Sequence, residues 1–129
     1  APMYTPGFAP PELYRDRDAL GPWSDIYGIG ATLYACVVGH APPEARERME
    51  NDRYEPVLAQ LKGRYSPALL RTIDWCLELN HEMRPQSVFV LQKVLRGDRE
   101  PLWPEQRGWV VRLLSALGDA RDHLPWGKV

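Results

Sequence analysis

Three prolines, a glycine and one carboxylate lie close together near the start of the chain, in the stretch TPGFAPPE. Because proline fixes φ and lacks a backbone N–H, this stretch cannot form helix interior or central strand. A loop stiffened in this way usually presents a group or packs in one fixed shape. Its candidate groups are the hydroxyl of Thr5, the turn made by Pro6, Gly7 and Phe8, and the carboxylate of Glu12.

The histidines and cysteines form no pattern that indicates metal binding or nucleophilic catalysis. His40, His81 and His123 are far apart, with no cysteine or carboxylate at metal-ligand spacing, so we expect no metal site. Cys36 and Cys76 each lie among apolar residues, and we expect two reduced thiols in a protein core. No hydrolase signature is present, and we assign no catalytic residue.

The composition is that of an ordinary globular domain. The 129 residues are 44% hydrophobic and 26% charged, and the net charge is −1. This charge gives no electrostatic case for binding nucleic acid or an anionic membrane. No signal peptide is evident and the longest uncharged run is too short and mixed to span a bilayer, so we expect a cytoplasmic protein.

The longest uncharged run, residues 26–43, predicts a buried helix of about 14 residues. Ser24 or Asp25 can cap its start and Gly39 can end it. Two glycines inside it are expected to permit close approach of another backbone. These glycines are Gly28 and Gly30. The apolar residues at helical spacing are Ile26, Ile29, Leu33, Tyr34 and Val37.

Further helices follow. Ser66 is a candidate N-cap for a helix with an apolar face. Pro85 is a candidate first-turn residue of another helix, which Gly97 is expected to end. Residues 43–51 alternate in charge sign and predict a solvated helix. Residues 104–117 have an amphipathic pattern that predicts a last helix. Strand signals are nearly absent, so the predicted fold class is all-α.

Three motifs in this order resemble the C-terminal lobe of a bacterial-type Ser/Thr protein kinase. In that family the activation segment ends in Thr-Pro-x-[Tyr/Phe]-x-Ala-Pro-Glu, an Asp-x-[Trp/Tyr]-x-x-Gly helix follows, and an arginine precedes the last helix of the lobe. Pro10 stands where the family usually has alanine. The residues that fit are Thr5, Phe8 and Glu12, then Asp25, Tyr27 and Gly30, and finally Arg84.

The resemblance implies a partial kinase C-lobe over residues 1–97, from the end of the activation segment to the last lobe helix. Residues 98–129 would form an extension with one amphipathic helix. By resemblance, Thr5, Pro6, Gly7 and Phe8 are substrate-binding residues, forming the floor under the residue after the phosphoacceptor. The residues with implied structural roles are Glu12, Asp25, Tyr27, Gly30 and Arg84.

The resemblance also implies that the parent protein transfers the γ-phosphoryl group of ATP, with Mg²⁺, to serine or threonine of a protein substrate. The chain contains no glycine-rich phosphate loop, no His-Arg-Asp loop and no Asp-Phe-Gly motif. We therefore expect the segment to hold no cofactor and to be inactive alone. Two alternatives remain: the lobe of a pseudokinase, and a free-standing helical interaction module.

Two structural expectations follow from the resemblance. Glu12 and Arg84 should form a buried, bidentate ion pair between the end of the activation segment and the loop before the last helix. In the family, the helix that matches residues 25–38 is also covered by elements absent here. We expect self-association through its uncovered face, or cover by the tail helix. That face would include some of Ile26, Ile29, Leu33 and Val37, together with Tyr4 and Phe8.

Overall fold

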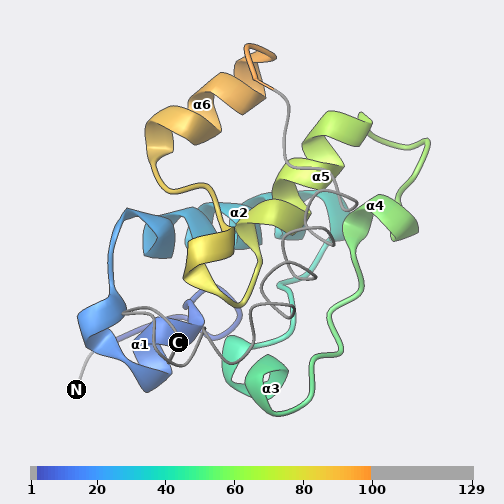
Figure 1. Ribbon diagram of the computed structural model, residues 1–129. Helices are drawn as coiled ribbons and strands as arrows, with labels where there is room; N and C mark the ends of the chain where they lie inside the picture. The colour runs from blue at the N-terminus through green and yellow to red at the C-terminus, as the bar shows by residue number, and fades with distance from the viewer. Residues whose placement is uncertain (1–2, 100–129) are drawn as a thin grey trace, which may run out of the picture.

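The computed structural model describes residues 3–99, and these residues are helical (Figure 1). Within this range there is no strand, only an isolated bridge between Lys62 and Tyr65. The predicted all-α class is therefore confirmed for the described residues. The elements are α1 (Pro11–Arg15), η1 (Arg17–Ala19), α2 (Pro22–Val38), α3 (Ala45–Glu50), α4 (Val57–Gln60), α5 (Pro67–Cys76), η2 (His81–Met83) and α6 (Val88–Arg96).

Helix α2 is the central element, with α3 towards one end of the molecule and α6 towards the other (Figure 1). It has 17 residues and is about 25 Å long, because it begins at Pro22, earlier than expected. The N-cap is Gly21 rather than Ser24 or Asp25, and the Ser24 hydroxyl accepts the Gly21 N–H at 3.2 Å. Gly39 ends the helix in the left-handed region at φ +99°, as predicted.

Helix α2 packs against α5 in the core. A Cβ at Gly30 would lie 2.5 Å from the Cβ of Cys76, so only glycine fits there without a shift. A Cβ at Gly28 would lie 3.7 Å from the Phe8 carbonyl oxygen, an ordinary contact distance. The expected close approach is thus found at Gly30, whereas at Gly28 the neighbouring backbone of Phe8 leaves room for a Cβ.

The prediction that α2 is buried all round is wrong, because Thr32 and Cys36 are exposed. Cys36 is therefore not a core thiol. Cys76 is one, and burial raises the pKa of its thiol to about 12. On the face expected to be uncovered, Ile26 is wholly buried and cannot contribute. The other three expected residues are half-buried: Ile29, Leu33 and Val37. Self-association through this face stays a prediction.

The two later helices begin with serine caps. The Ser66 hydroxyl accepts the Leu69 N–H at 3.2 Å at the start of α5, as expected. Helix α6 begins at Val88, because the Ser87 hydroxyl caps it through the Val90 N–H, and not at the first turn predicted from Pro85. Gly97 ends α6 at φ +81°, as predicted.

The predicted helix at 104–117 lies outside the described residues. Within residues 3–99, no helix combines the length and the apolar character needed to cross a membrane.

Candidate functional site

The loop from Thr5 to Phe8 is a tight turn. The Phe8 N–H donates to the Thr5 carbonyl at 3.1 Å, and Gly7 has φ +86°, a conformation that side chains rarely adopt. A Cβ at Gly7 would also lie 2.9 Å from the Ala41 Cβ and 3.1 Å from the Pro42 oxygen. The turn therefore requires glycine, both for its backbone conformation and for the close approach of the loop after α2.

One side of this turn faces solvent while the other is held by the body of the protein. Thr5 and Pro6 are exposed, whereas Gly7 is buried and the half-buried Phe8 ring packs against the core around α2. The Tyr4 ring meets the Tyr14 ring edge-on, with centroids 4.9 Å apart. The turn thus presents the Thr5 hydroxyl on a fixed support.

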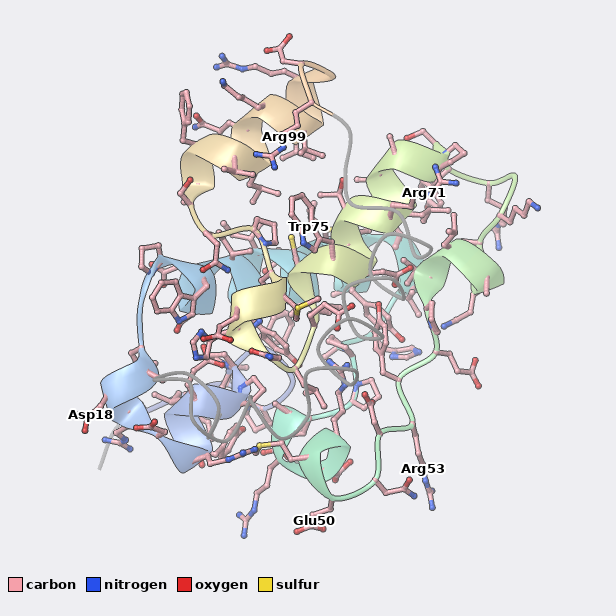
Figure 2. The ribbon with its side chains drawn as sticks, viewed as in Figure 1. Asp18, Glu50, Arg53, Arg71, Trp75 and Arg99 are labelled. Carbon is pink, nitrogen blue, oxygen red and sulfur yellow. The ribbon has the colours of Figure 1, made fainter. Side chains whose placement is uncertain are left out.

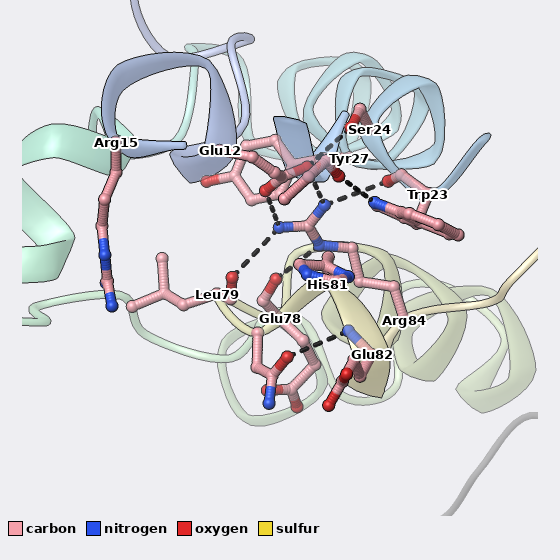
Figure 3. A network of polar contacts seen from close by, with 12 residues as sticks. Glu12, Arg15, Trp23, Ser24, Tyr27, Glu78, Leu79, His81, Glu82 and Arg84 are labelled. Carbon is pink, nitrogen blue, oxygen red and sulfur yellow. Dashed lines mark hydrogen bonds and ion pairs between the residues drawn. The ribbon is translucent and has the colours of Figure 1, made fainter. Parts of the chain in front are cut away.

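Glu12 in α1 and Arg84 before α6 form the ion pair that the family resemblance implied. Arg84 donates through Nη2 to Oε1 of Glu12 at 2.7 Å and through Nη1 to Oε2 of Glu12 at 2.9 Å (Figure 3). The contact is bidentate and both residues are buried. Ser24 donates to Oε2 of Glu12 at 2.7 Å, which joins the start of α2 to the same carboxylate.

Every N–H of the Arg84 guanidinium finds an acceptor. Besides the Glu12 carboxylate, Arg84 donates to the backbone oxygens of Trp23 at 3.0 Å, Glu78 at 2.7 Å and Leu79 at 3.1 Å. Arginine has five such donors, and five bonds are made. The guanidinium carbon also lies 4.9 Å from the centroid of the Tyr27 ring.

The electrostatics of the pair favour the charged carboxylate. Burial by itself would raise the pKa of Glu12, but the hydrogen bonds and positive charge of Arg84, with the Ser24 hydroxyl, outweigh burial. The pKa of Glu12 therefore lies below its ordinary value. The Glu12–Arg84 pair, together with the Ser24 hydroxyl, links three segments that are distant in sequence and fixes where the loop at residues 5–12 joins the helical body.

The other motif residues take distinct positions. Asp25 lies in the first turn of α2, where its carboxylate is exposed and makes no hydrogen bond to residues 3–99. Tyr27 is wholly buried, and burial raises the pKa of its hydroxyl. Gly30 lies about one helical turn after Tyr27 in α2 and contacts Cys76 of α5.

His81 is held against the start of α2. Its ring is half-buried and stacks on the Trp23 ring, with centroids 5.1 Å apart. The Trp23 indole N–H donates to the Ala19 carbonyl at 2.7 Å, which ties η1 to the start of α2. Within residues 3–99, no group of three or more His, Cys, Asp or Glu side chains is arranged to hold a metal ion.

Sequence analysis missed the role of Arg48, which was predicted to lie on a solvated face. Arg48 is buried and donates to the Tyr27 hydroxyl at 3.1 Å, to the Leu77 carbonyl at 2.7 Å and to Asp52. Neighbouring charged residues do face outward, as Glu50 and Arg53 show at the edge of the molecule (Figure 2). Alternating charge gives no signal that separates Arg48 from these neighbours.

Asp74 was also missed, because it lies inside the apolar pattern of α5. It is buried and accepts the Tyr54 hydroxyl at 2.6 Å and the backbone N–H groups of Val57 at 2.9 Å and Leu58 at 3.2 Å. The carboxylate thereby satisfies donors at the start of α4, a helix with no N-cap side chain of its own. Nothing in the local pattern marks this role.

A solved structure titled "PpkA-294 apo form" is similar to this chain, with a TM-score of 0.65 and 43% sequence identity. The match covers 70% of this chain and 31% of that one, so this chain spans less than a third of its length. No protein-family profile matches the chain. Together with the helical architecture, this likeness supports a kinase-related, C-lobe-like fold for the described residues.

Proposed function

We propose that this chain is the substrate-positioning part of a Ser/Thr protein kinase, whose parent transfers the γ-phosphoryl group of ATP to serine or threonine in proteins. The observation that carries the proposal is the loop of Thr5 and Pro6, exposed on a turn whose continuation is anchored by the buried pair of Glu12 and Arg84. The 43% identity to PpkA-294, a Ser/Thr kinase fragment, supports it.

Phosphoryl transfer depends on positioning more than on covalent chemistry by the protein. An acceptor hydroxyl must be held within about 3–3.5 Å of its reaction partner, and small misplacements lower the rate strongly. In this proposal the segment from Thr5 to Phe8 forms the floor under the residue after the phosphoacceptor. The Thr5 hydroxyl would bond the catalytic aspartate and a lysine of the parent.

The exposed carboxylate of Asp25 has a corresponding role in the proposal. It would accept backbone N–H groups from the catalytic loop of the parent, which would join that loop to the central helix α2. We assign ATP and Mg²⁺ binding to the rest of the parent, since the chain has no glycine-rich loop, His-Arg-Asp or Asp-Phe-Gly motif. The 129-residue chain alone should transfer no phosphoryl group.

A chimera tests the proposal. Residues 3–99 of this chain replace the matching part of PpkA-294, and transfer of labelled phosphate from ATP to a mixture of Ser/Thr peptides is measured. We expect an active chimera in which Thr5→Ala lowers kcat/KM by about tenfold or more, the effect of losing a hydrogen bond to a charged group.

Two control variants of the chimera test whether the loss of activity is specific to the Thr5 hydroxyl. Thr5→Ser keeps the hydroxyl and should retain most of the activity. Thr32→Ala changes an exposed threonine on α2, whose hydroxyl donates only to the Gly28 carbonyl at 2.9 Å, and should leave kcat/KM unchanged. A chimera that keeps its helical circular dichroism but transfers no phosphate, or that is indifferent to Thr5→Ala, would contradict the proposed role.

A further inference from the structure

A cavity of about 280 Å³ lies beside the ion pair, between α1, η1, α3 and the turn that precedes η2. Its lining mixes apolar side chains, such as Met49 and Leu79, with polar ones, such as Arg15, Asn80 and His81. Ligand sites in proteins combine an apolar lining with a few placed polar groups in this way. The proposed kinase activity uses none of these side chains.

The walls of this cavity are fixed by contacts already made. Arg84 binds both the Glu12 carboxylate and the Leu79 carbonyl, so it holds two opposite segments of the lining. The His81 ring is held by its stacking on Trp23 (Figure 3). A cavity with pre-positioned walls loses little conformational entropy when a ligand enters.

Arg15 is the charged donor of the lining, and within residues 3–99 it has no strong acceptor. Arg15 is exposed, and within the described residues its one hydrogen bond runs to the Met49 sulfur at 3.9 Å, a weak acceptor. The buried Nδ1 of His81 has no hydrogen-bond partner. The Glu12 carboxylate, in contrast, is fully engaged by Arg84 and Ser24. Asp16, the other acid of the lining, is exposed and accepts the backbone N–H of Asp18.

We propose that this cavity binds a segment of a partner protein in which an acidic side chain stands beside an apolar one. The carboxylate would pair with the Arg15 guanidinium in its preferred fork geometry. The apolar side chain would pack on Met49 and Leu79. A carboxylate fits better than a phosphate group, because among residues 3–99 Arg15 is the one arginine or lysine in the lining. A protein segment fits better than a free small acid, because the apolar lining needs an apolar group attached to the acid.

Peptide titrations of the isotopically labelled 129-residue chain, followed by NMR, test this site. The probe is the acetylated and amidated tripeptide Leu-Glu-Leu, and its partner is Leu-Gln-Leu. We expect the acidic peptide to bind about tenfold more tightly than the neutral one, with shifts at Asn80 and Met49. Arg15→Gln should remove that preference. Arg17→Gln, a matched change at an exposed arginine outside the lining, should keep it.

Three results would overturn the proposal. Equal binding of the two peptides would show that no carboxylate is recognised. If Arg15→Gln still preferred the acidic peptide over the neutral one, the peptide carboxylate would not bind at Arg15. Displacement of the acidic peptide by sodium acetate at matched concentration would show that the free carboxylate suffices, and that the ligand need not be a protein segment. None of these readouts involves phosphoryl transfer, so they are separate from the test of the proposed function.

Discussion

Glu12→Gln is expected to destabilise the fold strongly, because it leaves the charge of Arg84 buried without its counter-ion. The Arg84 side chain is 0% exposed and that of Glu12 is 3% exposed, so water cannot replace the lost partner. Removing one member of a buried pair costs roughly 3–5 kcal/mol. The three backbone carbonyls that also accept from Arg84 stay in place, so the expected loss of unfolding free energy is roughly 3 kcal/mol, the lower end of this range.

Urea unfolding followed by far-ultraviolet circular dichroism measures this loss as a change in midpoint at unchanged slope. The matched control is Glu50→Gln, the same chemical change at an exposed carboxylate of α3, which should alter stability by no more than about 0.5 kcal/mol. In a double-mutant cycle, Glu12→Ala and Arg84→Ala together should cost clearly less than the sum of the two single changes.

If Glu12→Gln and Glu50→Gln had the same unfolding midpoint, the buried pair would not stabilise the described fold. Additive effects in the double-mutant cycle would mean that the two side chains do not interact energetically, whatever their distance.

Three further predictions concern the helical body. Gly30→Ala should destabilise by roughly 1–3 kcal/mol through overpacking on α5, whereas Gly28→Ala, with room for a Cβ, should be neutral or stabilising in urea unfolding. Arg48→Met should lower the free energy of unfolding by roughly 2–3 kcal/mol, because it leaves buried acceptors unpaired. The exposed control Arg46→Met should change the urea unfolding midpoint little. The folded-state pKa of Glu12 lies below its ordinary value of 4.5, so the stability contributed by this carboxylate should be present at neutral pH and be lost as the pH falls from 4.5 through the lower folded-state pKa. A thermal-melting series should therefore show less acid sensitivity in Glu12→Gln than in the parent chain.

The parts of the fold that the sequence predicts well are those with strong local signals. Serine followed by proline at residue 66 caps α5, and glycine at residues 39 and 97 ends helices in the left-handed region, because these choices depend on a few adjacent residues. The start of α6 was misassigned, because Pro85 is compatible with a first turn in isolation. In the structure Ser87 caps the helix. The segment just before Ser87 is non-helical and contains Arg84, whose side chain donates to the Glu78 carbonyl.

Contacts between distant segments divide into two kinds. The pairing of Glu12 with Arg84 was predicted only because the motifs resemble a known family, since nothing local connects residues separated by 72 positions. Arg48 and Asp74 belong to no such motif, and their burial depends on where α3 and α4 meet α5. Periodicity reports which face of one helix is apolar, but it does not report which polar side chain reaches an acceptor on another element.

Phosphoryl transfer by the longest open reading frame that contains this sequence would show whether the parent protein is a Ser/Thr protein kinase. The protein is expressed whole and incubated with labelled ATP, Mg²⁺ and a mixture of Ser/Thr peptides. We expect His-Arg-Asp and Asp-Phe-Gly motifs upstream of residue 1, labelled serine or threonine, and a large loss of labelling in Thr5→Ala but not in Thr32→Ala. A folded protein that carries those motifs but labels no peptide would contradict the claim, and so would a reading frame that begins near residue 1.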